Sequence, residues 1–197
     1  MIIVTGATGF IGFYLVNQLS EEGFDVLAID KGGSEEAGYF KKKGIPFIQM
    51  DITKETDFDK LPREGIDAIV NLACMQPANM REESYDPREY INVNVLGVIN
   101  LLDFCLKNNI GRFVHTISHR SVQKLWELGE TIDEDSLRAI KYTGKFSIYS
   151  ISESAAEDII KHYIQEYGIK GILLRLPPVY GYGHHENMYK DGKVCKT

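Results

Sequence analysis

The sequence is poor in cysteine, and the few cysteines are not arranged for a structural role. Only three occur among 197 residues, at Cys74, Cys105 and Cys195, and no two of them form a Cys-x-x-Cys pair. An odd number of widely spaced thiols predicts neither a disulfide framework nor a zinc site. Because free thiols are typical of a reducing compartment, we expect a cytoplasmic protein.

Long basic runs and long apolar runs are also absent. The longest basic run is residues 41–43, and the chain has a formal net charge of −6 and an isoelectric point near 5.4. An acidic surface repels nucleic acid and anionic lipid, so we expect no nucleic-acid partner and no membrane. The N-terminal apolar run Ile2–Val4 is too short for a signal peptide or a membrane span.

The apolar residues that are present, 44% of the chain, suffice for one main domain. Short β-branched runs alternate with segments of helical period, a pattern typical of repeated βα units. This alternation predicts an α/β fold with a doubly wound parallel Rossmann sheet in the order 3-2-1-4-5-6, arranged as a three-layer αβα sandwich. The predicted strands are 2–5, 25–29, 46–49, 68–72, 113–116 and 171–175, and the predicted helices are 10–22, 35–42, 89–107 and 147–167.

Two of the predicted helices, 89–107 and 147–167, are apolar on more than one face. A helix that packs on one sheet face needs only one apolar stripe, so the surplus favours a partner surface and a homodimer. The alternative is that the two helices cover each other within one subunit. Between them, residues 125–146 are polar and lack a clear period, which predicts a long loop. Residues 181–197 show no strand or helix pattern.

A glycine motif lies between the first predicted strand and the first predicted helix. Gly6 permits a tight turn, Gly9 lets the backbone approach a pyrophosphate, and Gly12 lets the helix lie close to the strand. The amides that begin the helix, at Phe10 and Ile11, would face the phosphates together with the helix dipole. The motif predicts a dinucleotide site.

Asp30 ends the second predicted strand, about 20 residues beyond the glycine motif. A carboxylate at this position hydrogen-bonds the adenosine ribose hydroxyls and repels the extra phosphate of NADP. The residue therefore predicts a preference for NAD. The alternative is a solvated turn aspartate that precedes Lys31.

The glycine spacing resembles that of the extended short-chain dehydrogenases/reductases, the family of NAD-dependent sugar epimerases and dehydratases. Further motifs resemble the family pattern in the same order over nearly the whole chain. The resemblance implies that these motifs contact NAD, and that the contacting residues are Asp51, Ile52, Leu72, Ala73, Cys74, Asn94, Thr116, Leu176 and Pro177. For Cys74, a small buried thiol without cofactor contact is the alternative.

The resemblance also implies a catalytic group of Ser118 and Tyr149, with Tyr149 contacting the cofactor as well. In the family, a lysine four residues after the tyrosine shares its helix face, binds the nicotinamide ribose and lowers the tyrosine pKa. In this sequence Glu153 occupies that position. A carboxylate there disfavours the phenolate, so either activity is weak or another cation, such as Lys145, compensates.

Two histidine features invite a chemical interpretation. The run His184-His185-Glu186 offers metal-ligating groups without an evident third ligand, so no metal site is predicted. His115, within the fifth predicted strand, is interpreted as a packed strand residue and not as a catalytic base.

The resulting hypothesis is an NAD-dependent epimerase that acts on a nucleotide sugar through a transient keto sugar. His119 and Arg120 occupy the positions where dehydratases of the family carry an Asp-Glu pair, which favours epimerisation. The alternative hypothesis is an NAD-binding regulator, or a degenerate relative that has lost the catalytic lysine. We expect residues 1–180 to form the NAD-binding domain and residues 181–197 to begin a substrate-binding region that is largely absent.

Overall fold

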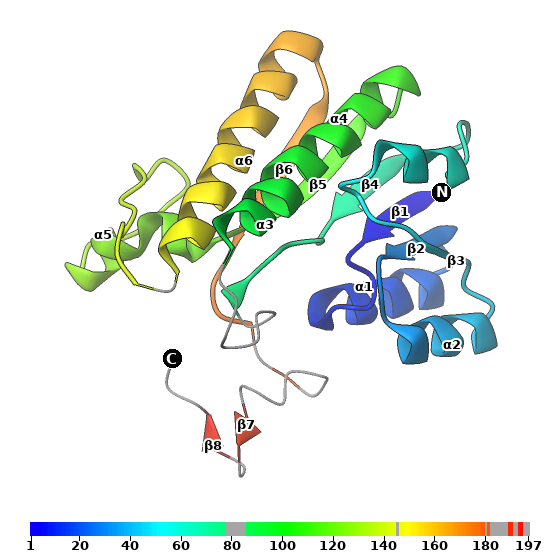
Figure 1. The fold of residues 1–197 in the computed structure, drawn as a ribbon, viewed down its shortest axis with the longest axis horizontal. Coiled ribbons are helices and arrows are strands. Elements are labelled where there is room, and N and C mark those ends of the chain that lie inside the picture. Colours follow the sequence, from blue (N-terminus) through cyan, green and yellow to red (C-terminus); the bar gives the residue numbers. More distant parts are fainter. Residues whose placement is uncertain (78–85, 145, 180, 182–188, 191–192, 195–197) are drawn as a thin grey trace.

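Six parallel strands form the centre of the protein (Figure 1). The computed structural model describes residues 1–77, 86–144, 146–179, 181, 189–190 and 193–194. The strands have the order β3-β2-β1-β4-β5-β6, which confirms the predicted doubly wound topology. Their bounds are β1 Ile2–Thr5, β2 Val26–Asp30, β3 Phe47–Gln49, β4 Ala68–Asn71, β5 Arg112–Ser118 and β6 Lys170–Leu176.

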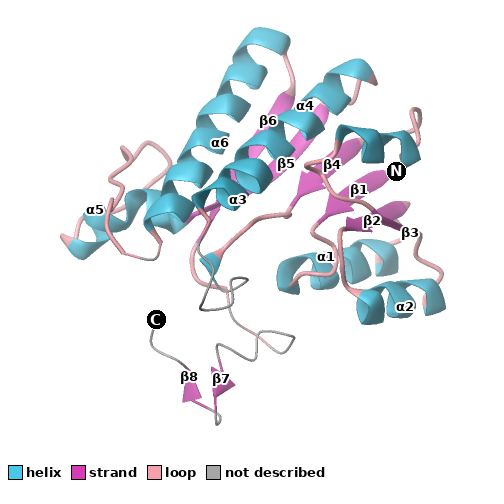
Figure 2. Cartoon of the chain, viewed as in Figure 1, coloured by secondary structure: helices cyan, strands magenta, loops and turns pink. Residues whose placement is uncertain are grey.

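The helices lie close to the predicted segments (Figure 2). Their bounds are α1 Phe10–Glu21, α2 Ser34–Lys42, α3 Pro87–Ile91, α4 Gly97–Lys107, α5 Gln123–Glu127 and α6 Ser147–Tyr167. Asp86 starts α3, because its side chain accepts a hydrogen bond from the Arg88 amide at 2.9 Å and Pro87 occupies the first helical position. Gly168, with a φ of 73°, ends α6.

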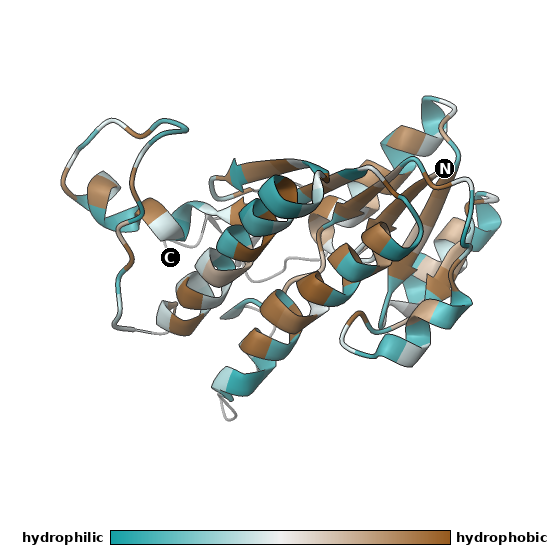
Figure 3. Ribbon diagram, turned by 90° about the horizontal axis from the view of Figure 1, so that it is seen from above, coloured by the Kyte–Doolittle hydropathy of each residue, from teal (hydrophilic) through white to brown (hydrophobic). Residues whose placement is uncertain are grey.

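Alternating strand residues divide the core into two clusters on opposite sheet faces. On one face, Ile3, Leu27 and Ile69 pack with residues of α4 and α6. On the other face, Val4 and Ala28 pack with residues of α1 and α2. Hydrophobic residues dominate the central strands (Figure 3). The second face is covered less completely at its β6 edge, where Ile172 is 55% exposed and Leu174 is 44% exposed.

Helices α4 and α6 lie side by side and contact each other (Figure 1). Much of their surplus apolar surface is therefore covered within the subunit, as the alternative interpretation held, while Leu96 and Ile151 stay partly exposed. The helical stretch Pro87–Lys107 is also long and apolar enough to cross a membrane, by length and composition alone. Its Val98, Leu101 and Leu102 are fully buried in the core, and a core helix of a soluble protein passes the same test.

Several elements differ from the sequence-based predictions. The predicted helix 89–107 contains a π-helical segment, η3 (Asn92–Leu96), between α3 and α4. The predicted loop 125–146 is wrong at its start, because α5 includes its first three residues and the 3-10 turn η4 (His119–Val122) precedes α5. Another 3-10 turn, η1 (Glu55–Lys60), comes after β3.

The prediction that residues 181–197 contain no strand is also wrong. Two short strands, β7 (Tyr189–Lys190) and β8 (Lys193–Val194), pair antiparallel there. Each is only two residues long, so neither gives the alternating apolar pattern by which a strand is recognised in a sequence.

Candidate functional site

The glycine motif forms the turn between β1 and α1. Gly6 has a φ of 66°, and a Cβ atom there would lie 2.7 Å from the backbone of Leu72 and Ala73. A Cβ atom on Gly12 would lie 2.1 Å from the Gly6 carbonyl oxygen. The Gly9 amide donates to that same oxygen at 3.0 Å. The motif therefore holds the start of α1 tightly against β1 and against the end of β4.

The first turn of α1 has an open amino end. Gly9 is its N-cap residue and provides no side chain to accept hydrogen bonds from the next amides, and no acidic residue lies in the first turn. Amides at the start of a helix, which include those of Ile11 and Gly12, have no acceptor within the helix. Such an end, with the positive pole of the helix dipole, suits a phosphate group.

Asp30 lies at the end of β2, beside this turn. Its Oδ2 atom accepts a hydrogen bond from the Thr8 amide at 3.1 Å, and its Oδ1 atom accepts one from the Gly32 amide at 3.3 Å. The Thr8 side chain also packs against Gly33, where a Cβ atom would lie 2.4 Å away. The carboxylate is thus fixed next to the helix start, as the dinucleotide prediction requires.

The end of β3 brings two more predicted cofactor residues to the same edge. Asp51 Oδ1 accepts hydrogen bonds from the Thr53 amide at 3.0 Å and from the Thr53 hydroxyl at 2.8 Å. Ile52 is buried beneath Gly97, and its carbonyl accepts a hydrogen bond from Asn100 at 2.9 Å. This turn is joined to α4 through Ile52.

A buried polar chain crosses three neighbouring strands below the end of β4. Thr5 donates from its hydroxyl to Asn71 Oδ1, and Asn71 Nδ2 lies 2.9 Å from His115 Nδ1. Burial lowers the pKa of His115 to about 4, so the imidazole is neutral at physiological pH. The Ala73 amide lies 3.4 Å from the Thr5 hydroxyl. His115 is therefore a packed strand residue, as interpreted, and the chain fixes the backbone at Leu72 and Ala73.

Ser118, Tyr149 and Glu153 come together at the carboxyl ends of β4 and β5, where Cys74 joins them. Tyr149 and Glu153 lie one turn apart on α6, and Ser118 ends β5. The Ser118 and Cys74 side chains are close enough to the Tyr149 hydroxyl to influence its pKa. Burial, and after it the Glu153 carboxylate, raises the Tyr149 pKa far above its usual range. A phenolate is strongly disfavoured here.

Glu153 is almost completely buried, with a relative exposure of 3%. Its Oε1 atom accepts a hydrogen bond from the Cys74 thiol at 3.3 Å. Burial raises its pKa to about 7, although the hydrogen bonds from Cys74 and from the Ser118 backbone favour the ionised form. Within the described ranges, no lysine or arginine nitrogen lies within ion-pair distance of this carboxyl group. Glu153 is a buried acid that titrates near neutrality.

Asn94 joins the loop after β4 to α6. Its Oδ1 atom accepts from the Met75 amide at 2.7 Å, and its Nδ2 atom donates to the Met75 carbonyl at 3.0 Å and to the Ser152 hydroxyl at 2.9 Å. Ser152 in turn donates to the Tyr149 carbonyl at 2.9 Å. The sequence-based prediction included Asn94 but missed Met75 and Ser152, which Asn94 contacts from the π-helical segment η3.

Arg120 is another residue that the prediction missed as a site component. Its guanidinium lies over the Phe146 ring, 3.8 Å from the ring centre, and donates to Gln123 at 2.9 Å. Arg120 is close enough to Tyr149 for the two side chains to interact electrostatically. Its position in the sequence could have identified it, because Arg120 lies two residues after Ser118, and segments that follow a strand often contain functional residues.

The remaining predicted residues are spread over β5, the end of β6 and the segment after it. Thr116 lies in β5, and Leu176 ends β6, where it is paired with Ser118 and precedes Pro177. Gly181 lies against the Phe10 ring. Lys145 and the run 184–186 lie outside the described residues. Among the described residues, no group of three or more His, Cys, Asp or Glu side chains could hold a metal ion.

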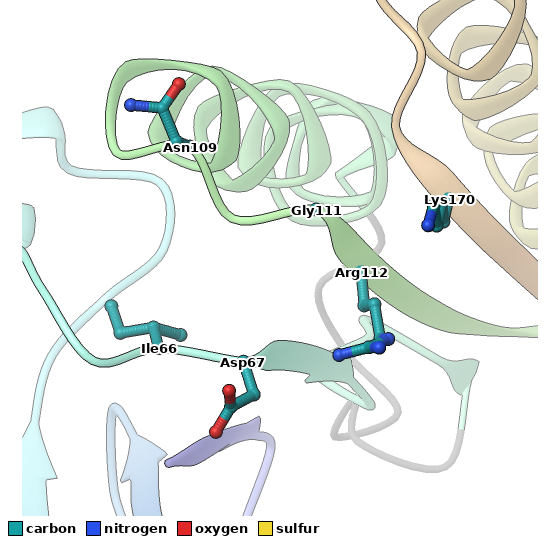
Figure 4. A pocket seen from close by; sticks show the side chains of 6 residues that line it. All are labelled: Ile66, Asp67, Asn109, Gly111, Arg112 and Lys170. Carbon is teal, nitrogen blue, oxygen red and sulfur yellow. The ribbon is translucent and has the colours of Figure 1, made fainter.

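A surface cavity of about 290 Å³ lies at the opposite edge of the sheet (Figure 4). It is lined by residues at the amino ends of β4, β5 and β6, among them Asp67, Arg112 and Lys170. Ligands of open α/β sheets bind outside the carboxyl ends of the strands, so this cavity is separate from the candidate site.

Comparison with known proteins supports the resemblance found in the sequence. Residues 2–196 match the NAD dependent epimerase/dehydratase family. A protein of Methanocaldococcus jannaschii that is provisionally named as a UDP-glucose 4-epimerase is 30% identical over 185 residues, which cover 92% of this chain and 56% of that protein. A UDP-glucose 4-epimerase of Pisum sativum is 29% identical, with coverage of 81% and 47%. The chain spans about half the length of the curated relatives it matches.

Solved structures agree with this result. The UDP-glucose 4-epimerase of Thermotoga maritima, solved with UDP-glucose, is 25% identical with a TM-score of 0.73, covering 91% of this chain and 56% of that one. The UDP-glucose 4-epimerase of Thermus thermophilus, solved with NAD, is 27% identical with a TM-score of 0.66, covering 88% and 54%.

Proposed function

The chain belongs to the NAD-dependent epimerase/dehydratase family. We propose that it binds NAD and acts as a nucleotide-sugar 4-epimerase. The observation that carries the proposal is the juxtaposition of a glycine turn without room for side chains and a carboxylate at the next strand end. Gly6 and Gly12 leave no space for a Cβ atom, and Asp30 lies 3.1 Å from the Thr8 amide.

The residues at this edge fit NAD. The start of α1, at Phe10, Ile11 and Gly12, suits the pyrophosphate, and Asp30 suits the adenosine ribose hydroxyls. Asp51 and Ile52 would border the adenine, while Leu72, Ala73, Cys74, Asn94, Thr116, Leu176 and Pro177 would border the remainder. When bound, NAD supplies a hydride acceptor and donor.

Ser118 and Tyr149 are proposed to hold the reacting sugar hydroxyl. They come from different elements, interact with each other, and lie at the sheet edge where ligands of this fold bind. Tyr149 would exchange a proton with the hydroxyl as a sugar carbon is oxidised to a transient ketone and reduced again. His119 and Arg120 come directly after Ser118 and provide no acid and base pair for water loss, which favours epimerisation over dehydration.

A purely regulatory NAD-binding role is less well supported, because the named UDP-glucose 4-epimerases of Caenorhabditis elegans and Pisum sativum are enzymes. We further propose that residues 1–180 are the NAD-binding domain, that residues 181–197 begin the substrate-binding region, and that the protein is a cytoplasmic homodimer. The partly exposed Leu96 of η3 and Ile151 of α6 support contact between copies through this face. Sedimentation as a monomer at micromolar concentration would count against the dimer.

Calorimetric titration with NAD, NADP, UDP-sugars and dTDP-sugars tests the function. We expect NAD to bind more tightly than NADP, and a UDP-hexose to reduce bound NAD, detected by nicotinamide absorbance. The variant Glu153→Lys distinguishes the two hypotheses, since a gain of sugar-dependent NAD reduction only in the variant would favour a degenerate relative. No affinity for any adenine dinucleotide would overturn the proposal.

A further inference from the structure

His115 is a polar residue in the interior of the sheet, within β5, and its relative exposure is 2%. Its ring stacks on that of Phe113, with 6.2 Å between the ring centres. Interior strands of a parallel sheet are usually apolar, and a buried polar group without a partner costs stability. Among the described residues, Nε2 of His115 has no hydrogen-bond partner. Packing alone would therefore favour an apolar ring here, and the hydrogen bond at Nδ1 is what a histidine adds.

Three buried polar residues form a row across the sheet. Thr5, Asn71 and His115 are register partners on β1, β4 and β5. The Asn71 amide group could in principle be turned, which would exchange its oxygen and its nitrogen. The Thr5 hydroxyl and the Ala73 amide both donate to Asn71 Oδ1, the second at 3.3 Å. Because a backbone amide can only donate, the turned orientation would place two donors face to face. The Asn71 nitrogen therefore faces His115.

This orientation determines where the imidazole carries its proton. Asn71 Nδ2 lies 2.9 Å from His115 Nδ1 and can only donate, so Nδ1 is the acceptor. A neutral imidazole carries one proton, which is then on Nε2. The other tautomer, or the charged ring, would present a donor at Nδ1 and favour the turned amide. Burial lowers the pKa of His115 to about 4 and so keeps the ring neutral.

The backbone that this row holds lies against the glycine turn. A Cβ atom on Gly6 would lie 2.7 Å from the Ala73 nitrogen, so the turn has no room to absorb a shift of that backbone. The Ala73 amide also lies 3.4 Å from the Thr5 hydroxyl, and the Leu72 amide donates to the Thr5 carbonyl at 3.2 Å. A displacement of Ala73 is therefore transmitted to the turn.

We propose that His115 is a positioning residue of the cofactor site, whose unprotonated Nδ1 holds Asn71 in the orientation that fixes the Ala73 amide beside the glycine turn. The identity of the ligand, NAD, rests on the proposed function. The His115 side chain is buried, so it acts through Asn71 and Ala73 and not by contact with the cofactor. The phosphate turn at the sheet edge thus depends on a hydrogen bond inside the sheet.

Nitrogen NMR of the purified chain reads the tautomer without cofactor. The protonated and unprotonated nitrogens of a neutral imidazole have well separated chemical shifts. The sequence contains five histidines, so the signals that disappear in His115→Asn assign this ring. We expect the proton on Nε2 at neutral pH and slow exchange of the Ala73 amide hydrogen with solvent. A proton on Nδ1 in the wild type would overturn the proposal.

Two substitutions separate the acceptor from the packing of the ring. His115→Phe keeps a ring against Phe113 but removes the acceptor, so the Ala73 amide should exchange about tenfold faster and NAD affinity should fall about tenfold. His115→Asn loses the ring but carries an oxygen on Cγ, where histidine carries Nδ1. Both quantities should then stay within about twofold of the wild type. Phe113→Leu is the matched control, because it removes the neighbouring ring and leaves the row of hydrogen bonds intact.

Each outcome decides the role of His115. Unchanged Ala73 exchange and NAD affinity in His115→Phe would overturn the proposal, and so would equal losses in His115→Asn or Phe113→Leu, because packing would then be the cause. If His115→Phe does not fold, the wild-type tautomer and the His115→Asn variant still decide. Absence of NAD affinity in the wild type would instead refute the proposed function, and the tautomer and the Ala73 exchange rates would still test the positioning role.

Discussion

The turn between β1 and α1 and the side-chain cluster around Tyr149 lie at the same sheet edge but are built in different ways. The turn is made of backbone atoms so close that a Cβ atom on Gly12 would lie 2.1 Å from a carbonyl oxygen. The cluster is made of polar side chains from three segments, centred on the buried Glu153. The turn should therefore be sensitive to added volume, and the cluster to changed charge.

The two regions also differ in how closely they match the family pattern. The turn matches it, because backbone geometry leaves few residue types that fit. At position 153, where the resemblance implies a lysine, the structure accommodates a carboxyl group by providing the Cys74 thiol and the Ser118 backbone as donors. Steric requirements restrict the residue types that fit the turn, while hydrogen-bond partners decide which side chain fits at position 153.

The largest expected effect comes from adding one methyl group to the turn. Gly12→Ala should displace α1 from β1, lower the free energy of unfolding by about 3 kcal/mol and weaken NAD binding more than about 100-fold. Urea unfolding and calorimetry measure the two effects. Unchanged NAD affinity in a folded Gly12→Ala variant would contradict the backbone account of the turn.

A change of charge without a change of shape probes the cluster. The Glu153 pKa is raised from 4.5 to about 7, so the folded state holds the proton more tightly and stability falls as pH rises through this window. Glu153→Gln lacks this loss and should gain up to about 3 kcal/mol over the wild type between about pH 4.5 and pH 8. Urea unfolding at a series of pH values measures the difference.

Glu157 provides the control for that comparison. It is equally buried on α6 but is ion-paired with Lys161 at 2.6 Å and with Arg175 at 3.5 Å. Its replacement by glutamine leaves Arg175 without a charged partner, so Glu157→Gln should destabilise the protein. A stability gain in both variants would show that the effect is not specific to Glu153.

Asp30 should have a smaller effect, because its role in the turn is electrostatic. Asp30→Asn keeps an oxygen for the Thr8 amide but removes the charge, so the preference for NAD over NADP should fall about tenfold, or about 1.4 kcal/mol. Calorimetric titration with both cofactors measures the ratio. Asp25→Asn, at an exposed carboxylate before β2, should leave the ratio unchanged.

The smallest expected effect is a gain in stability. A Cβ atom on Gly38, within α2, would meet no heavy atom within 4 Å other than those of its chain neighbours and the adjacent helix backbone. Gly38→Ala should therefore raise the free energy of unfolding by about 0.5–1 kcal/mol through helix propensity alone. Thermal unfolding of the Gly38→Ala variant measures this gain. A loss of stability would show that side chains are excluded at glycine positions outside the turn between β1 and α1 as well.

The strands and the order of the sheet could be predicted from the sequence because each depends on local patterns and on a general rule of chain crossover. The contact between Cys74 and Glu153 could not be predicted, since it joins residues 79 positions apart through side-chain packing. The sequence identified Glu153 only as an anomaly. Helix α5 was missed because five residues are too few for a recognisable helical period.

The π-helical segment Asn92–Leu96 has a consequence for the length of the chain. A wider turn takes up one residue beyond the α-helical count, so Tyr90 before it and Val98 after it both remain buried. Deletion of a single residue in the segment should convert it to regular helix while both flanking halves keep their packing. The protein would then lose only the inward placement of Asn94. A single-residue deletion in this segment therefore tests what Asn94 contributes to function.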